Sequence, residues 1–154
     1  MSYTNILVPF DDSSHARNAL AKAVELCEGK PNAQIHVVEV AAPPQDLLRT
    51  SMGPNRNDPA EQEEFAEELQ HRNENEDDQL ATRIASIVDD FAGELTVEVV
   101  YGVYTVDTIL DAAQRYNCNL IAMGSRGLGA LRGMLGSVSF AVLRSSEIPV
   151  LIVK

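Results

Sequence analysis

Short apolar runs alternate with amphipathic segments along the chain, and this alternation restricts the fold more than any other feature of the sequence. The runs have the lengths and the β-branched composition of strands. They lie at residues 5–9, 35–40, 95–101, 120–123 and 148–153. Between them, apolar residues recur at helical spacing in segments 16–27, 61–91, 107–116 and 137–144. Strand and helix therefore alternate from one end of the chain to the other.

The composition of the strands indicates how the sheet is covered. Runs such as LIAM and PVLIV are apolar at every position, which is typical of parallel strands buried on both faces. We therefore predict an α/β fold: a single doubly wound domain over residues 1–154, with a five-stranded parallel sheet in the order 3-2-1-4-5 and helices on both faces. A chain of 154 residues, 45% of them hydrophobic, is long enough to bury one core.

Two segments are less regular than the rest. Residues 41–58 contain three prolines and a glycine before Asp58, and we expect this stretch to be a loop and the segment most prone to disorder. The helix over residues 61–91 has a dense acidic face, which is typical of a solvated surface, and we expect it to break near residues 71–76.

The acidic balance of the chain and its two cysteines limit the possible partners. The sequence has 23 acidic and 12 basic residues and a net charge of -11, which repels nucleic acids and anionic membranes. No run approaches the roughly 20 apolar residues that span a bilayer, and the first ten residues lack the pattern of a signal peptide. We therefore expect a cytoplasmic protein that neither binds nucleic acid nor inserts into a membrane. Cys27 and Cys118 stand in no metal-binding spacing, and we expect both to be small buried hydrophobic residues.

A glycine-rich segment follows the fourth predicted strand. Residues 123–139 read MGSRGLGALRGMLGSVS, and this segment holds five of the nine glycines of the chain. Glycine permits the backbone to approach a ligand closely, so that successive N–H groups can point at one phosphate. Gly136 and Ser137 then begin the last helix, whose unpaired N–H groups and positive dipole end favour an anion. Ser137 and Ser139 offer hydroxyl groups there, and Arg126 and Arg132 add local positive charge.

The same segment has a plainer interpretation. The glycines would then form a flexible loop, and Ser137 would only cap the helix. A P-loop is excluded because GxxxxGK[ST] does not occur, and GxGxxG fits at no register. Any phosphate site here must therefore be of another kind.

The loop after the first strand is the second candidate region. Residues Pro9 to Asp11 lie at the carboxyl end of that strand, and ligands of open α/β sheets bind at such ends where the strand order reverses. If the first and fourth strands are neighbours, this loop meets the glycine-rich segment. A buried carboxylate at Asp11 would then accept hydrogen bonds from a ribose or from the amino group of adenine. Alternatively Asp11 is a turn or cap residue, and this plainer role is the more expected one for Asp12.

These motifs together resemble the universal stress protein family. The resemblance covers residues 4–154 and rests on ILVPFDDS, MGSRG, the GS pair that begins the last helix, and PVLIVK. The ATP-binding class of that family has G-x-x-G, nine further residues and then G-[ST]. The matching positions here are Gly124, Gly127, Gly136 and Ser137, with eight residues between the second and third glycines. We expect the missing residue to fall in the loop.

The resemblance implies a ligand and a set of contacts. The ligand is ATP or another adenine nucleotide such as AMP, with magnesium or manganese entering only together with the nucleotide. The further positions that match the family's contacts are Pro9, Phe10, Asp11, Val40, Met123, Val138 and Ser139. The family also implies a regulatory nucleotide-dependent switch in the stress response and a homodimer through the last strand, residues 148–153. This chain departs from the family at Asp12, where glycine is common, at Glu39, where histidine is common, and at Asn119, where aspartate is common.

Three functions remain open at this stage. A regulatory nucleotide-binding module agrees best with the glycine segment. A slow ATP hydrolase would need a placed base, but His15, His36 and His71 are scattered over three elements, and we expect them to be exposed or hydrogen-bonded. A nucleotide-free interaction protein would use the acidic helix, residues 41–58 and an unknown protein partner. We therefore predict no catalytic residue and no metal site, and at most weak ATPase activity.

Overall fold

The computed structural model describes residues 2–45, 58–128 and 133–154, and these residues have the predicted α/β architecture. Within them, five parallel strands form one sheet in the order β3-β2-β1-β4-β5. The strands are β1 (Asn5–Pro9), β2 (Gln34–Ala41), β3 (Glu94–Tyr101), β4 (Leu120–Gly124) and β5 (Val150–Val153). The helices are α1 (Ser14–Leu26), α3 (Pro59–Val88), α4 (Thr105–Arg115) and α5 (Ser137–Ser145). The predicted strand order and doubly wound topology are thus confirmed.

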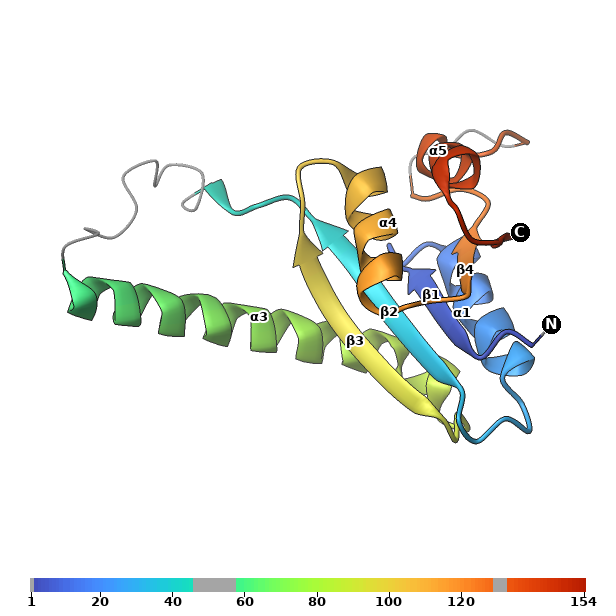
Figure 1. Ribbon diagram of the computed structural model, residues 1–154, viewed down its shortest axis with the longest axis horizontal. Helices are drawn as coiled ribbons and strands as arrows, with labels where there is room; N and C mark the ends of the chain where they lie inside the picture. Colours follow the sequence, from blue (N-terminus) through green and yellow to red (C-terminus); the bar gives the residue numbers. More distant parts are fainter. Residues whose placement is uncertain (1, 46–57, 129–132) are drawn as a thin grey trace.

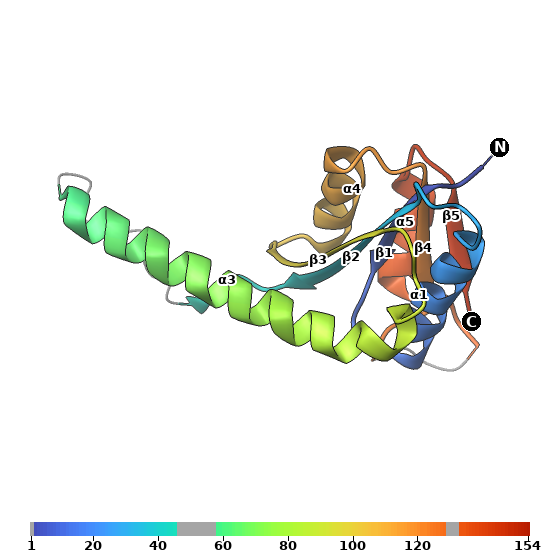
Figure 2. The ribbon, with the colours of Figure 1, turned by 90° about the horizontal axis from the view of Figure 1, so that it is seen from below.

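The helices cover both faces of the sheet. α1 and the carboxyl-terminal half of α3 lie on one face, whereas α4 and α5 lie on the other (Figures 1 and 2). The strands alternate their side chains between these two layers. Ile6 and Val8 belong to the core beneath α1 and α3, whereas Leu7 faces the core beneath α4 and α5. Because both sides are buried, β4 is apolar at every position, and β1 is apolar from Ile6 to Pro9.

Local sequence signals explain where α1 begins and ends. Ser13 is the N-cap, and its hydroxyl oxygen accepts a hydrogen bond from the backbone N–H of Ala16. Gly29 follows the helix with a positive φ of 71°, a conformation that favours glycine. The inward face of α1 consists largely of alanine, including the buried Ala19 and Ala23, so the helix approaches the sheet closely.

The long helix α3 differs from the prediction in one respect. The expected break near residues 71–76 is wrong, because α3 is continuous from Pro59 to Val88. That stretch contains neither glycine nor proline, and the low helix propensity of its asparagines costs only a few tenths of a kcal/mol each, roughly. Gln70 and Glu74, four residues apart, also share a side-chain hydrogen bond of 3.0 Å across the expected break.

The two halves of α3 pack differently. Leu80 and Ile84, in the carboxyl-terminal half, are its buried residues and belong to the core beneath α1. The amino-terminal half extends away from the sheet (Figure 1), and Phe65 and Leu69 there are only half-buried. Tertiary packing therefore stabilises the carboxyl-terminal half of α3 far more than the amino-terminal half.

Two further expectations concern the connections and the last strand. Most of the predicted loop 41–58 lies outside the described residues, except for its ends at 41–45 and Asp58, which is the N-cap of α3. β5 starts at Val150, two residues later than expected, although the carbonyl of Pro149 already accepts a hydrogen bond from the N–H of Ile121. Among the helices of the described ranges, none is both long enough and apolar enough to cross a membrane.

Candidate functional site

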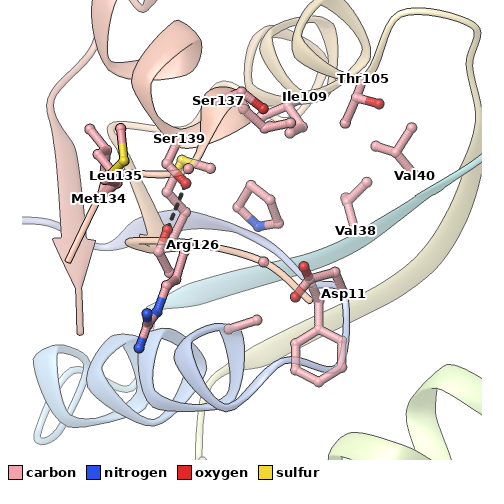
Figure 3. A pocket seen from close by; sticks show the side chains of 18 residues that line it. Asp11, Val38, Val40, Thr105, Ile109, Arg126, Met134, Leu135, Ser137 and Ser139 are labelled. Carbon is pink, nitrogen blue, oxygen red and sulfur yellow. Dashed lines mark hydrogen bonds between the residues drawn. The ribbon is translucent and has the colours of Figure 1, made fainter. Parts of the chain in front are cut away.

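A cavity of about 590 Å³ lies at the carboxyl ends of β1, β2 and β4. Figure 3 shows it between the loop that carries Asp11, the α4 helix and the start of α5. All eleven positions predicted to contact a nucleotide line it: Pro9, Phe10, Asp11, Val40, Met123, Gly124, Gly127, Gly136, Ser137, Val138 and Ser139. Seven further residues complete the lining: Ala16, Val38, Thr105, Ile109, Arg126, Met134 and Leu135. Its volume falls within the range of small-molecule sites.

The pairing of β1 with β4 brings the two predicted loops together. These strands are parallel neighbours, with Ile6 opposite Leu120 and Leu7 opposite Ile121. The strand order reverses at this point, since β2 continues the sheet on one side and β4 on the other. The loop after β1 is also tied to β2, because the N–H of Phe10 donates to the carbonyl of Val38 at 2.9 Å.

The carboxylate of Asp11 is half-buried and faces the glycine segment. Its Oδ1 atom accepts hydrogen bonds from the backbone N–H and the hydroxyl of Ser13, which fixes the turn before α1. Its Oδ2 atom points toward Gly127, so closely that a Cβ atom at that position would collide with it. Asp11 thus combines the turn role with an oxygen that faces the cavity and can accept a hydrogen bond from a ligand.

Two glycines allow the close approach of neighbouring segments. A Cβ atom at Gly124 would lie 2.8 Å from the carbonyl carbon of His15, which is backbone of α1 and cannot turn away. At Gly127 the obstacle is the Asp11 side chain, which can turn away. Gly124 therefore sets the distance between β4 and α1, whereas Gly127 leaves room for the carboxylate of Asp11.

The amino terminus of α5 points its backbone toward the same space. Gly136 is the N-cap, and among the residues that the structure describes no side chain caps this helix. The first N–H groups of a helix have no partner within it, so those of residues 137–139 remain available to an anion. Ser137 is exposed at the first helical position and lines the cavity.

The sequence suggested that the hydroxyl of Ser139 would donate to a phosphate, but it donates to the protein backbone instead. It is buried and donates to the carbonyl of Gly124 at 2.8 Å, as the dashed line in Figure 3 shows. This bond ties the start of α5 to the end of β4. Ser139 therefore holds the two sides of the glycine segment together, and its O–H is not free to donate to a ligand in this arrangement.

One side of the cavity is apolar. Val38 and Val40 project from β2, while Thr105 and Ile109 project from α4 toward them (Figure 3). Val38, Thr105 and Ile109 were not predicted. Val38 could have been found from its position two residues before Val40, because alternate residues of a strand share a face. The α4 residues carry no local signal, since their place in the cavity depends on how the helix packs.

Among the described residues that line the cavity, Arg126 is the one with a positively charged side chain, and it forms a hydrogen bond with a histidine. Its Nε donates to Nε2 of His15 at 2.7 Å, and the hydroxyl of Ser125 lies 3.4 Å from Nδ1 of the same ring. The sequence indicated the local charge of Arg126, whereas its contact with α1 could not be foreseen. The other predicted local cation, Arg132, lies outside the described residues.

Of the three histidines, which we expected to be exposed or hydrogen-bonded, His36 is neither among the described residues. His71 is exposed and His15 is hydrogen-bonded, as expected. His36, by contrast, is buried beneath Tyr116 at a ring-centroid distance of 4.0 Å, and neither ring nitrogen has a hydrogen-bond partner among the described residues. Removal from water lowers the pKa of His36, so the neutral imidazole is favoured.

The two cysteines are buried and unpaired with one another, in agreement with the prediction. Burial raises the pKa of the Cys118 thiol to about 12 and also raises that of Cys27. Both thiols therefore stay protonated and pack as small apolar groups. Within the described ranges, no group of three or more His, Cys, Asp or Glu side chains could hold a metal ion.

Comparison with known proteins places the chain in a family. The sequence profile of the universal stress protein family matches residues 2–154. No curated protein is similar enough in sequence to be matched to this chain. The structure of the hypothetical protein MJ0577, used for a structure-based assignment of its biochemical function, is similar to this chain. The two sequences are 26% identical and the TM-score is 0.73, over 100% of this chain and 97% of that one.

Two similar structures contain nucleotides. A universal stress protein in complex with cAMP is 21% identical with a TM-score of 0.63, over 99% of this chain and 98% of that one. The universal stress protein from Archaeoglobus fulgidus in complex with dAMP is 23% identical with a TM-score of 0.58, over the full length of both chains. The profile match spans nearly the whole sequence, and the fold agrees with it. The chain therefore belongs to the universal stress protein family.

Proposed function

We propose that this protein binds an adenine nucleotide, in the first instance ATP, in the cavity at the carboxyl ends of β1, β2 and β4. The observation that carries the proposal is the convergence of all eleven predicted contact residues, from four separate parts of the chain, on this one cavity. An apolar wall for a base and an uncapped helix terminus for phosphates face the same space. Similar structures with cAMP and dAMP give the proposal independent support.

The chemistry of the lining suggests how the nucleotide is oriented. The base would lie against Val38, Val40 and Ile109, whose side chains are apolar. The ribose would lie near Asp11, where Oδ2 can accept a hydroxyl hydrogen bond. The phosphates would lie at the glycine segment and the first turn of α5, where backbone N–H groups can bind them. Magnesium or manganese would arrive with the phosphates.

Loss of binding in two variants tests this placement. Gly127→Val puts a branched side chain where the Asp11 carboxylate lies, and Ser137→Ala removes a hydroxyl from the phosphate end. We expect ATP affinity, measured by isothermal titration, to fall in both, by roughly tenfold for the loss of one hydrogen bond to a charged group. Ser145→Ala is the control, because Ser145 is exposed and lies outside the cavity. Unchanged affinity in both test variants would reject the proposed site.

We further propose that the bound nucleotide acts as a regulatory switch in the stress response, in the cytoplasm. Met134 and Leu135 line the cavity and are also exposed, so a ligand there can alter a surface that a partner contacts. The unpaired, buried cysteines are compatible with a reducing compartment. The switch requires that a protein partner binds the nucleotide-bound and nucleotide-free forms with different affinities, which a pull-down with and without ATP would reveal.

A further inference from the structure

Four charged side chains form a connected network on the side of the sheet that α1 and α3 cover. Arg83 of α3 donates to both carboxylate oxygens of Glu39, from Nη1 to Oε1 at 3.2 Å and from Nη2 to Oε2. The same Nη1 atom lies 3.8 Å from Oδ2 of Asp12. Oδ1 of Asp12 in turn accepts a hydrogen bond from Arg17 of α1. We call these four residues the charged bridge.

The charged bridge joins two segments that line the cavity. Glu39 stands between Val38 and Val40 on β2, and Asp12 directly follows Asp11. Because alternate residues of a strand face opposite sides, Glu39 points toward α3 while the two valines point into the cavity. Figure 3 shows these valines and the Asp11 carboxylate facing the same space. The charged bridge therefore connects the segment where we place the base to the segment where we place the ribose.

The loop after β1 has a backbone conformation that needs such support. Asp12 has a φ of 64°, in the left-handed region that few residues other than glycine adopt. A residue keeps this conformation only where the surrounding structure holds it there. Arg17, besides binding Asp12, lies over the ring of Phe10 at 5.9 Å and donates to the carbonyl of Arg83 at 3.4 Å. The loop is thus fixed to both helices.

Arg83 is well placed to be the centre of the charged bridge. It lies on the packed half of α3, next to the fully buried Ile84, so its backbone is fixed by the core. Its planar guanidinium can bind the carboxylate of Glu39 through two nitrogens and still reach Asp12, which a lysine ammonium cannot do in the same way. The side chains of Arg83 and Glu39 are 33% and 25% exposed. Ion pairs this exposed contribute little to stability, so the geometry that the pair imposes is its larger effect.

We propose that Arg83 is a positioning residue of the nucleotide site. Through Glu39 and Asp12 it holds β2 and the loop after β1 at a fixed separation, so that the contacts for base and ribose are in place before the nucleotide binds. A site that is ordered in advance binds more tightly, because binding does not have to order it. Arg83 does not line the cavity and acts only through its two carboxylate partners. This inference rests on the proposed nucleotide site.

The test compares the affinities of ATP and AMP, measured by isothermal titration, in the wild type, Arg83→Gln and Arg83→Lys. Two control variants separate positioning from other effects. Arg115→Gln removes the same charge from an ion pair with Glu98 that lies outside the cavity. Ile87→Ala, four residues further along α3, weakens the packing against the same core without removing a member of the charged bridge.

We expect Arg83→Gln to bind both nucleotides more weakly by the same factor, roughly tenfold, which is within the range for residues that act on a site without touching the ligand. The factor is the same because ATP and AMP share the base and the ribose. Arg83→Lys should lose less affinity, since it keeps the charge and can form one ion pair. Both control variants should bind as the wild type does.

Three results would overturn the inference while leaving the nucleotide site intact. The first is wild-type affinity in Arg83→Gln. The second is a much larger loss for ATP than for AMP, which would show that Arg83 attracts the phosphates as a cation. The third is an equal loss in Ile87→Ala, which would show a general effect of weakened packing. Circular dichroism checks that Arg83→Gln is folded, and Arg83→Lys serves for the same comparison if it is not. A wild type that binds neither nucleotide would reject the site itself, and with it this inference.

Discussion

At the scale of single residues, His36 is the clearest departure from ordinary packing. It lies on β2, between β3 and β1, and is stacked on Tyr116, with both ring nitrogens buried and without partners among the described residues. Burial without hydrogen bonds disfavours the charged ring, which lowers the pKa of His36 in the folded state. The unfolded chain therefore binds a proton more readily than the folded one.

The stability of the protein should consequently fall with acidification. At neutral pH His36 is largely uncharged in both the folded and the unfolded state, so its ionisation has little effect on the free energy of unfolding. Below the ordinary histidine pKa of about 6.5, the unfolded state binds a proton at His36 more readily than the folded state does, and this favours unfolding. We expect the free energy of unfolding, from urea denaturation, to decrease between about pH 7.5 and 5.5 in the wild type, and to decrease less in His36→Leu. His71→Gln is the matched control because His71 is exposed. Equal pH dependence of the wild type and His36→Leu would contradict this account.

The two glycines at the cavity should respond differently to alanine. Gly124→Ala collides with the backbone of α1, so the sheet or the helix must move, and we expect a loss of stability of roughly 1–3 kcal/mol together with weaker ATP binding. Gly127→Ala displaces the Asp11 carboxylate and no backbone, so we expect weaker binding with a smaller loss of stability than in Gly124→Ala. Thermal unfolding and ATP titration of both variants separate these effects. A Gly127→Ala protein as unstable as Gly124→Ala would show that the Asp11 loop is rigid.

At the scale of elements, α3 divides into a packed half and a projecting half. Ile84→Ala removes a fully buried side chain and should lower the free energy of unfolding by roughly 2–5 kcal/mol. Leu69→Ala, in the projecting half, should lower it by less than about 1 kcal/mol, since Leu69 is only half-buried. Urea denaturation of both variants gives the comparison. Similar losses would mean that the projecting half contributes to the core as strongly as the packed half.

The elements themselves could be predicted from local sequence because their patterns are strong. The runs at β4 and β5, apolar throughout, indicated a parallel sheet, and the Ser13 cap and Gly29 marked the two ends of α1. The break predicted in α3 was wrong because the effect of the polar residues there was overestimated. Their low helix propensity weakens a helix slightly but does not interrupt it.

The site was predictable only in part. The loops that follow β1 and β4 carry recognisable motifs, whereas Thr105 and Ile109 reach the cavity through the packing of α4, and the Arg126 contact with His15 joins residues 111 positions apart. Such contacts depend on tertiary structure and leave no local pattern. For the same reason the sequence could not predict that the ring of His36 has no hydrogen-bond partner among the described residues. The pattern of a strand does not show whether a polar side chain within it forms a hydrogen bond in the folded protein.

At the scale of the whole molecule, β5 is an edge strand of the sheet. The carbonyls of Pro149 and Val153 accept hydrogen bonds from Ile121 and Ser125, so the odd-numbered residues of this strand direct their backbone groups toward β4. Alternate residues of a strand direct these groups to opposite sides, so the N–H and C=O of Ile152 point away from the sheet. Phe140 and Leu143 of the neighbouring α5 are also exposed, at 55% and 47%. An unprotected apolar edge favours association, which supports the proposed homodimer through residues 148–153.

The dimer proposal makes a direct prediction. We expect the wild type to have the mass of two chains in light scattering after gel filtration, and Ile152→Pro to shift toward one chain, because proline removes the outward N–H while leaving the bonds to β4 in place. A matched variant on an exposed site away from the edge, His71→Gln, should remain dimeric. Circular dichroism of Ile152→Pro checks that it is folded. A wild type of single-chain mass at all concentrations would contradict the proposal.

The central claim is that an adenine nucleotide binds on the glycine segment at the carboxyl edge of the sheet. Hydrogen–deuterium exchange of the protein with and without saturating ATP tests both the binding and its place. We predict slower amide exchange in residues 9–13, 124–128 and 133–139, the segments that contribute most of the residues lining the cavity, and no change in the projecting half of α3. Unchanged exchange in all three segments, or protection confined to other parts of the chain, would contradict the account.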